Sequence, residues 1–171
     1  MKRYFFEQIK QRIIERVPEV KTIGLFNNQI SKSAENNPIG FPAVFVEFET
    51  IDWQSQQRGI QVGPANVKFY IAVETYKTNL SGEKISESND LDFLDLVAKI
   101  HVGINGFDNE KFGPLLRVSE NQDSDHDNVL VWETVYKTQF VDDGAETRYS
   151  KPLIEYDPTT DNDFKLTIST V

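Results

Sequence analysis

The chain has 171 residues, 39% of them hydrophobic and 12% aromatic, which suits one folded domain with a sizeable core and excludes a disordered chain. It contains no Cys and no run of eighteen apolar residues, which excludes disulfides, thiol chemistry and a membrane-spanning helix. The net charge is −9, and residues 81–171 hold nineteen Asp and Glu against eight Lys and Arg, so we expect no tight binding of nucleic acid.

The first predicted element is an amphipathic helix over residues 4–17. Pro18 ends it, because proline disfavours helical geometry at the residue before it. Glu7 interrupts the apolar start of the chain, which is not typical of a signal peptide, so we expect a protein that is not secreted. Apolar residues spaced three or four apart form one face of this helix: Phe5, Phe6, Ile9, Ile13, Ile14 and Val17.

Three strands are predicted next, at residues 20–26, 43–49 and 67–76. A polar loop at 31–40 separates the first two. The second and third strands alternate apolar and polar residues, the pattern of a half-buried antiparallel strand. Their apolar faces consist of Val44, Val46 and Phe48 in one strand and Val67, Phe69, Ile71 and Val73 in the other.

The connection at residues 52–66 is long for a hairpin loop. It either extends both neighbouring strands or projects from the domain. Trp53, Ile60 and Val62 lie in it among polar residues. If exposed, these side chains mark a protein interface, and the alternative is that they fold back onto the sheet.

A second helix is predicted from residue 89 to about Gly103 or Gly106, followed by a hairpin of strands at 115–121 and 129–141. The apolar face of this helix consists of Phe93, Leu94, Val97, Ile100, His101 and Ile104.

The stretch DSDHDN at residues 123–128 lies between the two hairpin strands and resembles the start of a calcium loop. Counted from Asp123, the sixth position is Asn128 instead of glycine, and the twelfth is Thr134 instead of glutamate. A strand also follows, where a calcium loop leads into a helix. The sequence therefore favours a solvated turn over a metal site.

Residues 144–171 differ in composition and are predicted to form an acidic extension beyond a core domain at 1–143. Its segment FKLTIST, residues 164–170, is expected to add a strand to an exposed sheet edge, on its own subunit or a neighbour's. Phe164, Leu166 and Ile168 are therefore further interface candidates, beside the three in the 52–66 connection.

Catalytic motifs are missing from the sequence: there is no GxSxG, HExxH, GxxxxGK[ST] or GxGxxG, and there are only two His residues. Glu47 and Glu49, with Lys68 or Glu74 on the adjacent strand, could hold a magnesium ion as in nucleases. A solvent-facing polar stripe explains the same pattern more simply. We assign no catalytic residue, metal ligand or cofactor and expect a protein that is not an enzyme.

Together these elements predict an α+β fold: a single domain with a mostly antiparallel sheet of about five strands, two helices packed on one face, and the C-terminal extension.

In order and spacing, these elements resemble the tail terminator, or tail-completion, proteins of tailed bacteriophages and prophages. The similar features are the opening helix YFFEQIKQRIIERVPEV, the strands FPAVFVEFE and VKFYIAVETY, the helix DFLDLVAKIHVGI and the closing strand VLVWETVYKTQFVDD. The resemblance covers about residues 1–143 and includes no diagnostic motif. The extension at 144–171 and the loop at 31–40 are longer than that pattern.

The resemblance implies a structural protein that assembles as a ring, often a hexamer in that family, closes the tail tube and joins it to the head. Its partners would be copies of itself and the tail-tube and head-connector proteins, and its location the virion tail or the bacterial cytoplasm during assembly. An acidic channel fits this role, because it lets DNA slide without sticking. The alternatives are a small binding module of unknown ligand and, third, a metal-dependent enzyme.

Overall fold

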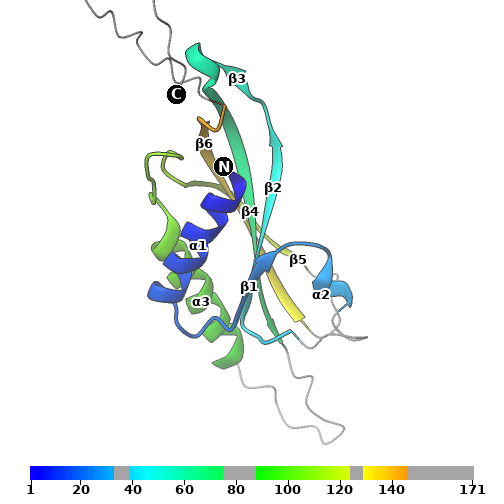
Figure 1. Ribbon diagram of the computed structural model, residues 1–171. Coiled ribbons are helices and arrows are strands. Elements are labelled where there is room, and N and C mark those ends of the chain that lie inside the picture. The colour runs from blue at the N-terminus through cyan, green and yellow to red at the C-terminus, as the bar shows by residue number, and fades with distance from the viewer. Residues whose placement is uncertain (33–38, 75–87, 124–128, 146–171) are drawn as a thin grey trace, which may run out of the picture.

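The computed structural model contains a six-stranded sheet with two long helices on one face (Figure 1). The structure describes residues 1–32, 39–74, 88–123 and 129–145. The strand order is β1-β2-β4-β6-β5, and the short β3 also pairs with β4. The helices are α1 (Lys2–Arg16), α2 (Gln29–Lys32), α3 (Ser88–Ile104) and the 3-10 turn η1 (Gln57–Gly59), and the strands are β1 (Thr22–Leu25), β2 (Ala43–Ile51), β3 (Gln54–Ser55), β4 (Gln61–Glu74), β5 (Leu116–Asp123) and β6 (Val129–Asp142).

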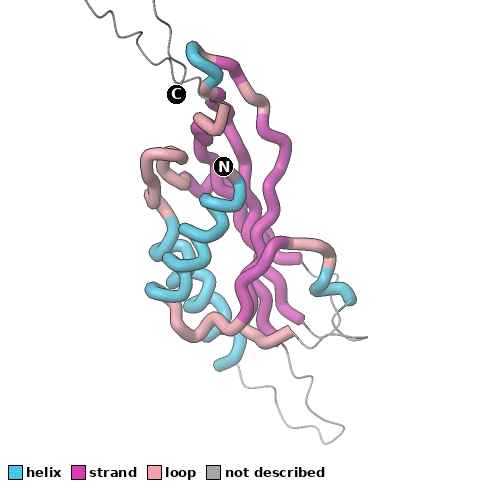
Figure 2. The backbone as a smooth tube through the Cα atoms, in the orientation of Figure 1, coloured by secondary structure: helices cyan, strands magenta, loops and turns pink. Residues whose placement is uncertain are grey.

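Helices α1 and α3 lie side by side on one face of the sheet, as Figure 2 shows. Arg12 Nε of α1 donates a hydrogen bond of 2.9 Å to the Gly103 carbonyl of α3. A Cβ at Gly103 would lie 3.3 Å from Arg16 Cβ, so glycine allows this close approach of the helices. The predicted α+β fold with two helices on one face is confirmed, and the sheet has one strand more than expected.

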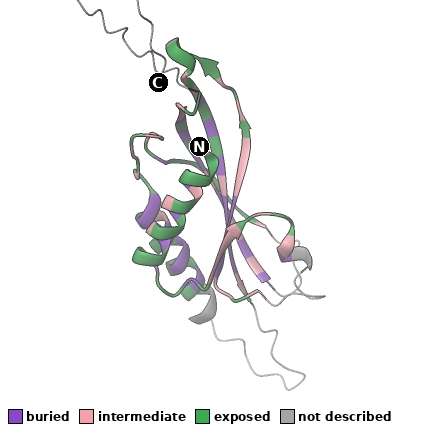
Figure 3. Ribbon diagram, viewed as in Figure 1, coloured by how far each residue is buried: buried purple, intermediate pink, exposed green. Residues whose placement is uncertain are grey.

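The main core lies between these helices and the sheet (Figure 3). Phe5 of α1 is fully buried, and its ring makes edge contacts with Phe48, Phe112 and Phe140 at centroid distances of 5.6, 4.8 and 5.0 Å. The predicted apolar faces of both helices are largely confirmed. The exceptions are Ile14, Leu94, Phe6 and His101, which are exposed or half-buried, and Leu96, which is buried and was not predicted.

The opposite face of the sheet is also covered at one end, which the sequence did not predict. Residues 43–46 of β2 are all buried, so the expected half-buried alternation is wrong there. Ile30 of α2 joins a second core cluster with Phe45 and Tyr70, and the Phe26 ring stacks on Tyr70 with a centroid distance of 3.9 Å. The rest of that face, hereafter the open face, carries mostly polar side chains, among them Glu47, Lys68 and Lys137.

The 52–66 connection extends both strands, the first of the two predicted alternatives. Strand β2 continues to Ile51 and β4 begins at Gln61, which leaves a short tip at residues 52–60. A Cβ at Gly63 would lie 2.8 Å from Ile51 Cγ2 and 3.2 Å from the Trp53 ring, so only glycine fits beneath these side chains.

The predicted hairpin is present: β5 and β6 pair antiparallel from Leu116↔Lys137 to Asp123↔Val131. Residues 124–128, most of the DSDHDN stretch, lie outside the described residues. So do residues 146–171, with the candidates Phe164, Leu166 and Ile168. The division of the chain at 143 and 144 therefore stays a prediction.

Candidate functional site

The acidic residues Glu47 and Glu49 of β2 are paired with neighbouring side chains in the part of the chain that the structure describes. The Tyr70 hydroxyl donates a hydrogen bond of 2.5 Å to Glu47. Glu49 lies 3.3 Å from Lys68 Nζ and accepts a hydrogen bond of 3.1 Å from Asn66. No group of three or more His, Asp or Glu able to hold a metal occurs among these residues.

His101 contacts a buried side chain of the sheet. Its Nδ1 lies 2.8 Å from the hydroxyl of Tyr136, a fully buried side chain on β6. Burial lowers the pKa of His101, and the positive charge of Arg117 adds to the effect. This lowered pKa favours the neutral imidazole, whose Nδ1 can accept the hydrogen bond of the Tyr136 hydroxyl in the tautomer with the proton on Nε2. The other histidine, His126, lies outside the described residues.

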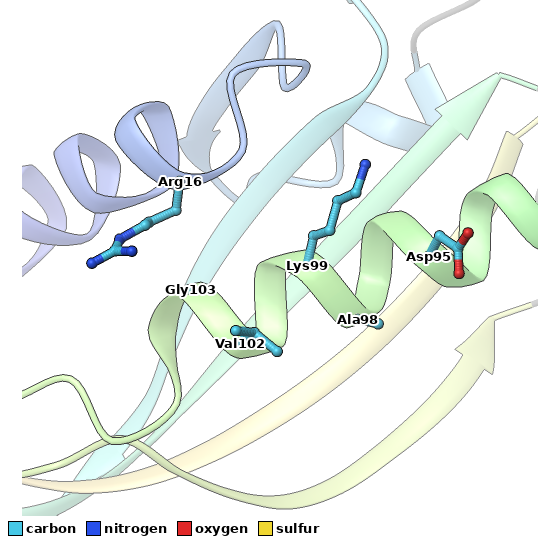
Figure 4. A pocket seen from close by; sticks show the side chains of 6 residues that line it. All are labelled: Arg16, Asp95, Ala98, Lys99, Val102 and Gly103. Atoms are coloured by element: carbon cyan, nitrogen blue, oxygen red, sulfur yellow. The ribbon is translucent and has the colours of Figure 1, made fainter.

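An open groove of about 430 Å³ runs between the end of α1 and the outer side of α3 (Figure 4). Lys99 Nζ at its border lies 2.9 Å from Glu19, and this hydrogen bond raises the pKa of Lys99. The groove is shallow and has no nucleophile or acid pair suited to catalysis. Its lining is Arg16, Asp95, Ala98, Lys99, Val102 and Gly103.

The outer side of α3 carries an apolar stripe next to this groove. Leu91, Leu94 and Val102 are 63%, 46% and 77% exposed, and Ala98 lies between them. Their spacing of three and four residues places them on one face, opposite the buried face of the same helix. An amphipathic helix at a protein surface normally exposes polar residues there, so a second apolar face indicates a further contact.

Strand β5 beside α3 is an open sheet edge. It pairs only with β6 among the described strands, and every residue in it except Asp123 is exposed. Leu116 and Val118 are 54% and 55% exposed. A bulge between Arg117 and Ser119 interrupts the ladder, so side-chain packing suits this edge better than continuous strand pairing. Leu116 pairs with Lys137, so its side chain lies on the open face of the sheet, whereas the α3 residues lie on the helix side. We call the apolar residues that flank this edge from both sides the α3–β5 surface: Leu91, Leu94, Ala98, Val102, Leu116 and Val118.

The other side of the molecule exposes a second apolar pair. Leu25 on the edge strand β1 is 53% exposed and Ile14 of α1 is 50% exposed. Ile14 is two residues from both Arg12 and Arg16, which contact α3 at Gly103, so it points away from α3. We call Ile14 and Leu25 the α1–β1 surface. All the large hydrophobic side chains that the described residues expose, apart from Tyr4, belong to one of these two surfaces.

The interface residues predicted in the 52–66 connection are half-buried and do not gather in one patch. Trp53 packs against the main core on the helix side of the sheet. A Cβ at Gly63 would point to the helix side, toward the Trp53 ring. Side chains alternate along a strand, so the preceding Val62 lies on the open face. Ile60 lies at the tip, and its carbonyl accepts a hydrogen bond of 2.7 Å from the Gln56 amide. Their role in an interface stays a prediction.

The two apolar edge surfaces were missed in the sequence. The signal for the first was available: Leu91, Leu94 and Val102 have helical spacing on the side of α3 away from Ile100. The signal at Leu116 and Val118 was hidden, because edge and central strands have the same alternating pattern.

No protein-family model matches the sequence, and no curated protein sequence matches it either. Among solved structures, the chain is similar to a chain of the virion of a native gene transfer agent particle, with 7% sequence identity and a TM-score of 0.42. The similarity covers 78% of this chain and 92% of that chain. Within the described residues, no helix is long and apolar enough to cross a membrane.

Proposed function

We propose that this protein is a non-enzymatic structural component of a phage or prophage tail that assembles as a ring, closes the tail tube and joins it to the head. The observation that carries the proposal is the pair of unlike apolar surfaces at the two opposite edges of the sheet, β5 and β1. The element order of the sequence, which resembles that of tail terminator proteins, is the second ground for the proposal.

Two unlike surfaces favour head-to-tail contacts between copies. The α3–β5 surface of one copy can meet the α1–β1 surface of the next, and each copy then keeps one surface free for a further neighbour. Contacts of this kind generate a ring when the rotation between copies closes, and an open filament when it does not. Six copies, as in the family that the sequence resembles, is the expected closure.

The charge of the chain suits a channel for DNA. A net charge of −9 repels the phosphate backbone, so nucleic acid can pass through the ring without binding tightly. The partners in this role are further copies of the chain, the tail-tube protein and the head-connector protein, and the location is the virion tail.

Two lysine substitutions test the contact directly. Val118→Lys disables the α3–β5 surface and Leu25→Lys the α1–β1 surface, and both sites are exposed, so folding should tolerate the changes. Gln139→Lys, at an exposed site on β6, is the control with the same change of charge. Mass photometry, with and without tail-tube protein, measures the size of the assemblies.

We expect rings from the unmodified chain and from Gln139→Lys, and monomers from either variant of the two surfaces. An equal mixture of Val118→Lys and Leu25→Lys should form dimers and nothing larger, because each copy supplies the surface that the other lacks. A mixture that stays monomeric contradicts head-to-tail contact. An unmodified chain that stays monomeric with tail-tube and connector proteins present contradicts the ring itself and favours the binding-module alternative.

A further inference from the structure

The outer side of β2 is open beyond Val46 in the described residues. Strand β1 pairs with β2 only from Ala43 to Val46, where the Phe26 amide donates a hydrogen bond of 2.9 Å to the Val46 carbonyl. Backbone groups in a strand alternate in direction, so the amide and carbonyl of Phe48 point to the same side as those of Val46. No described strand pairs with them there. We call residues 47–51 on this side the β2 edge.

The side chains along the β2 edge have an apolar side and an acidic side. On the helix side, Phe48 is half-buried, its ring centroid lies 5.6 Å from that of the buried Phe5, and Lys2 Nζ lies 5.8 Å from the Phe48 ring centroid. On the open face, Glu47 and Glu49 are the neighbouring side chains. A strand that pairs with this edge should therefore carry apolar residues on its helix side and at least one Lys or Arg on its other side, next to Glu47 and Glu49.

The chain leaves the described domain at the 52–60 tip, which follows this edge in the sequence. A Cβ at Gly59, in the tip that follows β2 and β3, would lie 2.4 Å from the Ala145 carbonyl oxygen, so the start of the C-terminal segment is packed on the tip. Figure 1 shows the end of β6 at the same end of the sheet as β3. A random-coil chain of the same length as residues 146–163 has a root-mean-square span of about 20–25 Å, so the segment that follows can reach the β2 edge at high local concentration.

We propose that residues 164–170 of the same chain add to the β2 edge as an antiparallel strand. Strand β2 runs toward the tip and the C-terminal chain returns from it, which sets the antiparallel direction. Phe164, Leu166 and Ile168 then lie on the helix side with Phe48, and Lys165 lies beside Glu47 and Glu49. This pairing covers an edge that would otherwise be a template for other chains.

The other open edge fits this segment less well. The helix-side residues of β5 are Arg117, Glu120 and Gln122, as their pairing with Tyr136, Thr134 and Trp132 shows. An apolar face of the added strand would lie beside these polar groups. The charge and apolar pattern therefore select the β2 edge, and this inference does not depend on ring assembly.

Because the chain contains no Cys, engineered pairs report contacts without background. Glu49→Cys is combined with Thr167→Cys or with Ser169→Cys, and the control pairs place Ser119→Cys, on β5, with the same two positions. The full-length chains are oxidised at low concentration, and the disulfides are mapped by peptide mass spectrometry. We expect an intrachain disulfide at Glu49→Cys and none at Ser119→Cys. Equal or faster cross-linking to Ser119→Cys, none at either site, or cross-links between chains only would each overturn the proposal.

Hydrogen exchange at the Phe48 amide provides a readout without cysteines. This amide should be protected in the full chain and should exchange roughly ten-fold faster in Leu166→Asp, because the added strand supplies its hydrogen bond. Ile154→Asp is the matched control, since it makes the same kind of change in the extension outside residues 164–170. Equal exchange in all three chains would overturn the proposal.

Discussion

Truncating Phe5 to alanine tests whether α1 and the sheet form one cooperative core. Phe5 is fully buried and contacts three aromatic rings from β2, β6 and the segment before β5. Removing a buried phenylalanine costs about 3–5 kcal/mol, and each aromatic pair contributes roughly 0.5–1.5 kcal/mol beyond its buried area. Three such pairs place the expected loss toward the upper part of that range, at about 4 kcal/mol.

Equilibrium urea unfolding measures this loss, followed by the fluorescence of the two tryptophans, Trp53 and Trp132. With an m-value of about 2 kcal/mol per molar urea, the midpoint of Phe5→Ala should fall by about 2 M with m unchanged. Tyr4→Ala, at the neighbouring exposed position, is the control and should change stability by less than about 0.5 kcal/mol. A loss below about 2 kcal/mol in Phe5→Ala would refute the rigid three-ring cluster, because the neighbours would then have filled the cavity.

Three further outcomes follow from the same reasoning. The pKa of His101 in the folded state is below its unfolded value of 6.5, so its contribution to stability is present above that pH and is lost as the pH falls through the folded pKa. In thermal melts, the melting temperature of the unmodified chain should therefore fall more steeply below about pH 6.5 than that of His101→Gln. Deleting residues 144–171 should leave a folded core with native circular dichroism but weaken assembly in mass photometry, and failure to fold would place the segment in the core. Calcium at about the millimolar level should leave the melting temperature unchanged, whereas a micromolar site in DSDHDN would add roughly 4 kcal/mol at a thousand-fold excess, and a rise abolished by Asp125→Asn would establish that site.

The elements with a strong period could be predicted from the sequence. Helix α1 and strand β6 followed their apolar spacing closely, because burial of one face determines both patterns. Strand β4 starts six residues earlier than expected, at Gln61 instead of Val67, since Gly63-Pro64 looks like a turn. Pro64 has no amide hydrogen to donate to a neighbouring strand. It pairs with Gln139 of β6, and on the β2 side it lies in the gap between the pairs Ile51↔Ala65 and Gln54↔Val62, where no strand partner needs that hydrogen bond.

The covering of the second face could not be predicted, because it depends on tertiary contacts of irregular segments. Phe26, Ile39 and Phe41 pack there from loops without any period. The same limit applies to the candidate surfaces. Leu25 and Val118 are exposed because β1 and β5 are the edge strands of the sheet. The order of the strands is determined by contacts across the whole chain and cannot be predicted from a local pattern.

The central pairing of β4 with β6 also constrains how the chain folds during its synthesis. These strands are joined along their whole length, from Gln61↔Asp142 to Glu74↔Val129, yet helix α3 and strand β5 lie between them in the chain. Such non-local pairing must close a long loop before any of its contacts form, which makes folding slow. On the ribosome, the β2–β4 hairpin and α1 can form early, but the middle of the sheet stays unpaired until residue 142 has emerged. The nascent chain therefore exposes the edge of β4 from the completion of Glu74 until β6 has been made, and this is the period in which we expect it to need protection from aggregation.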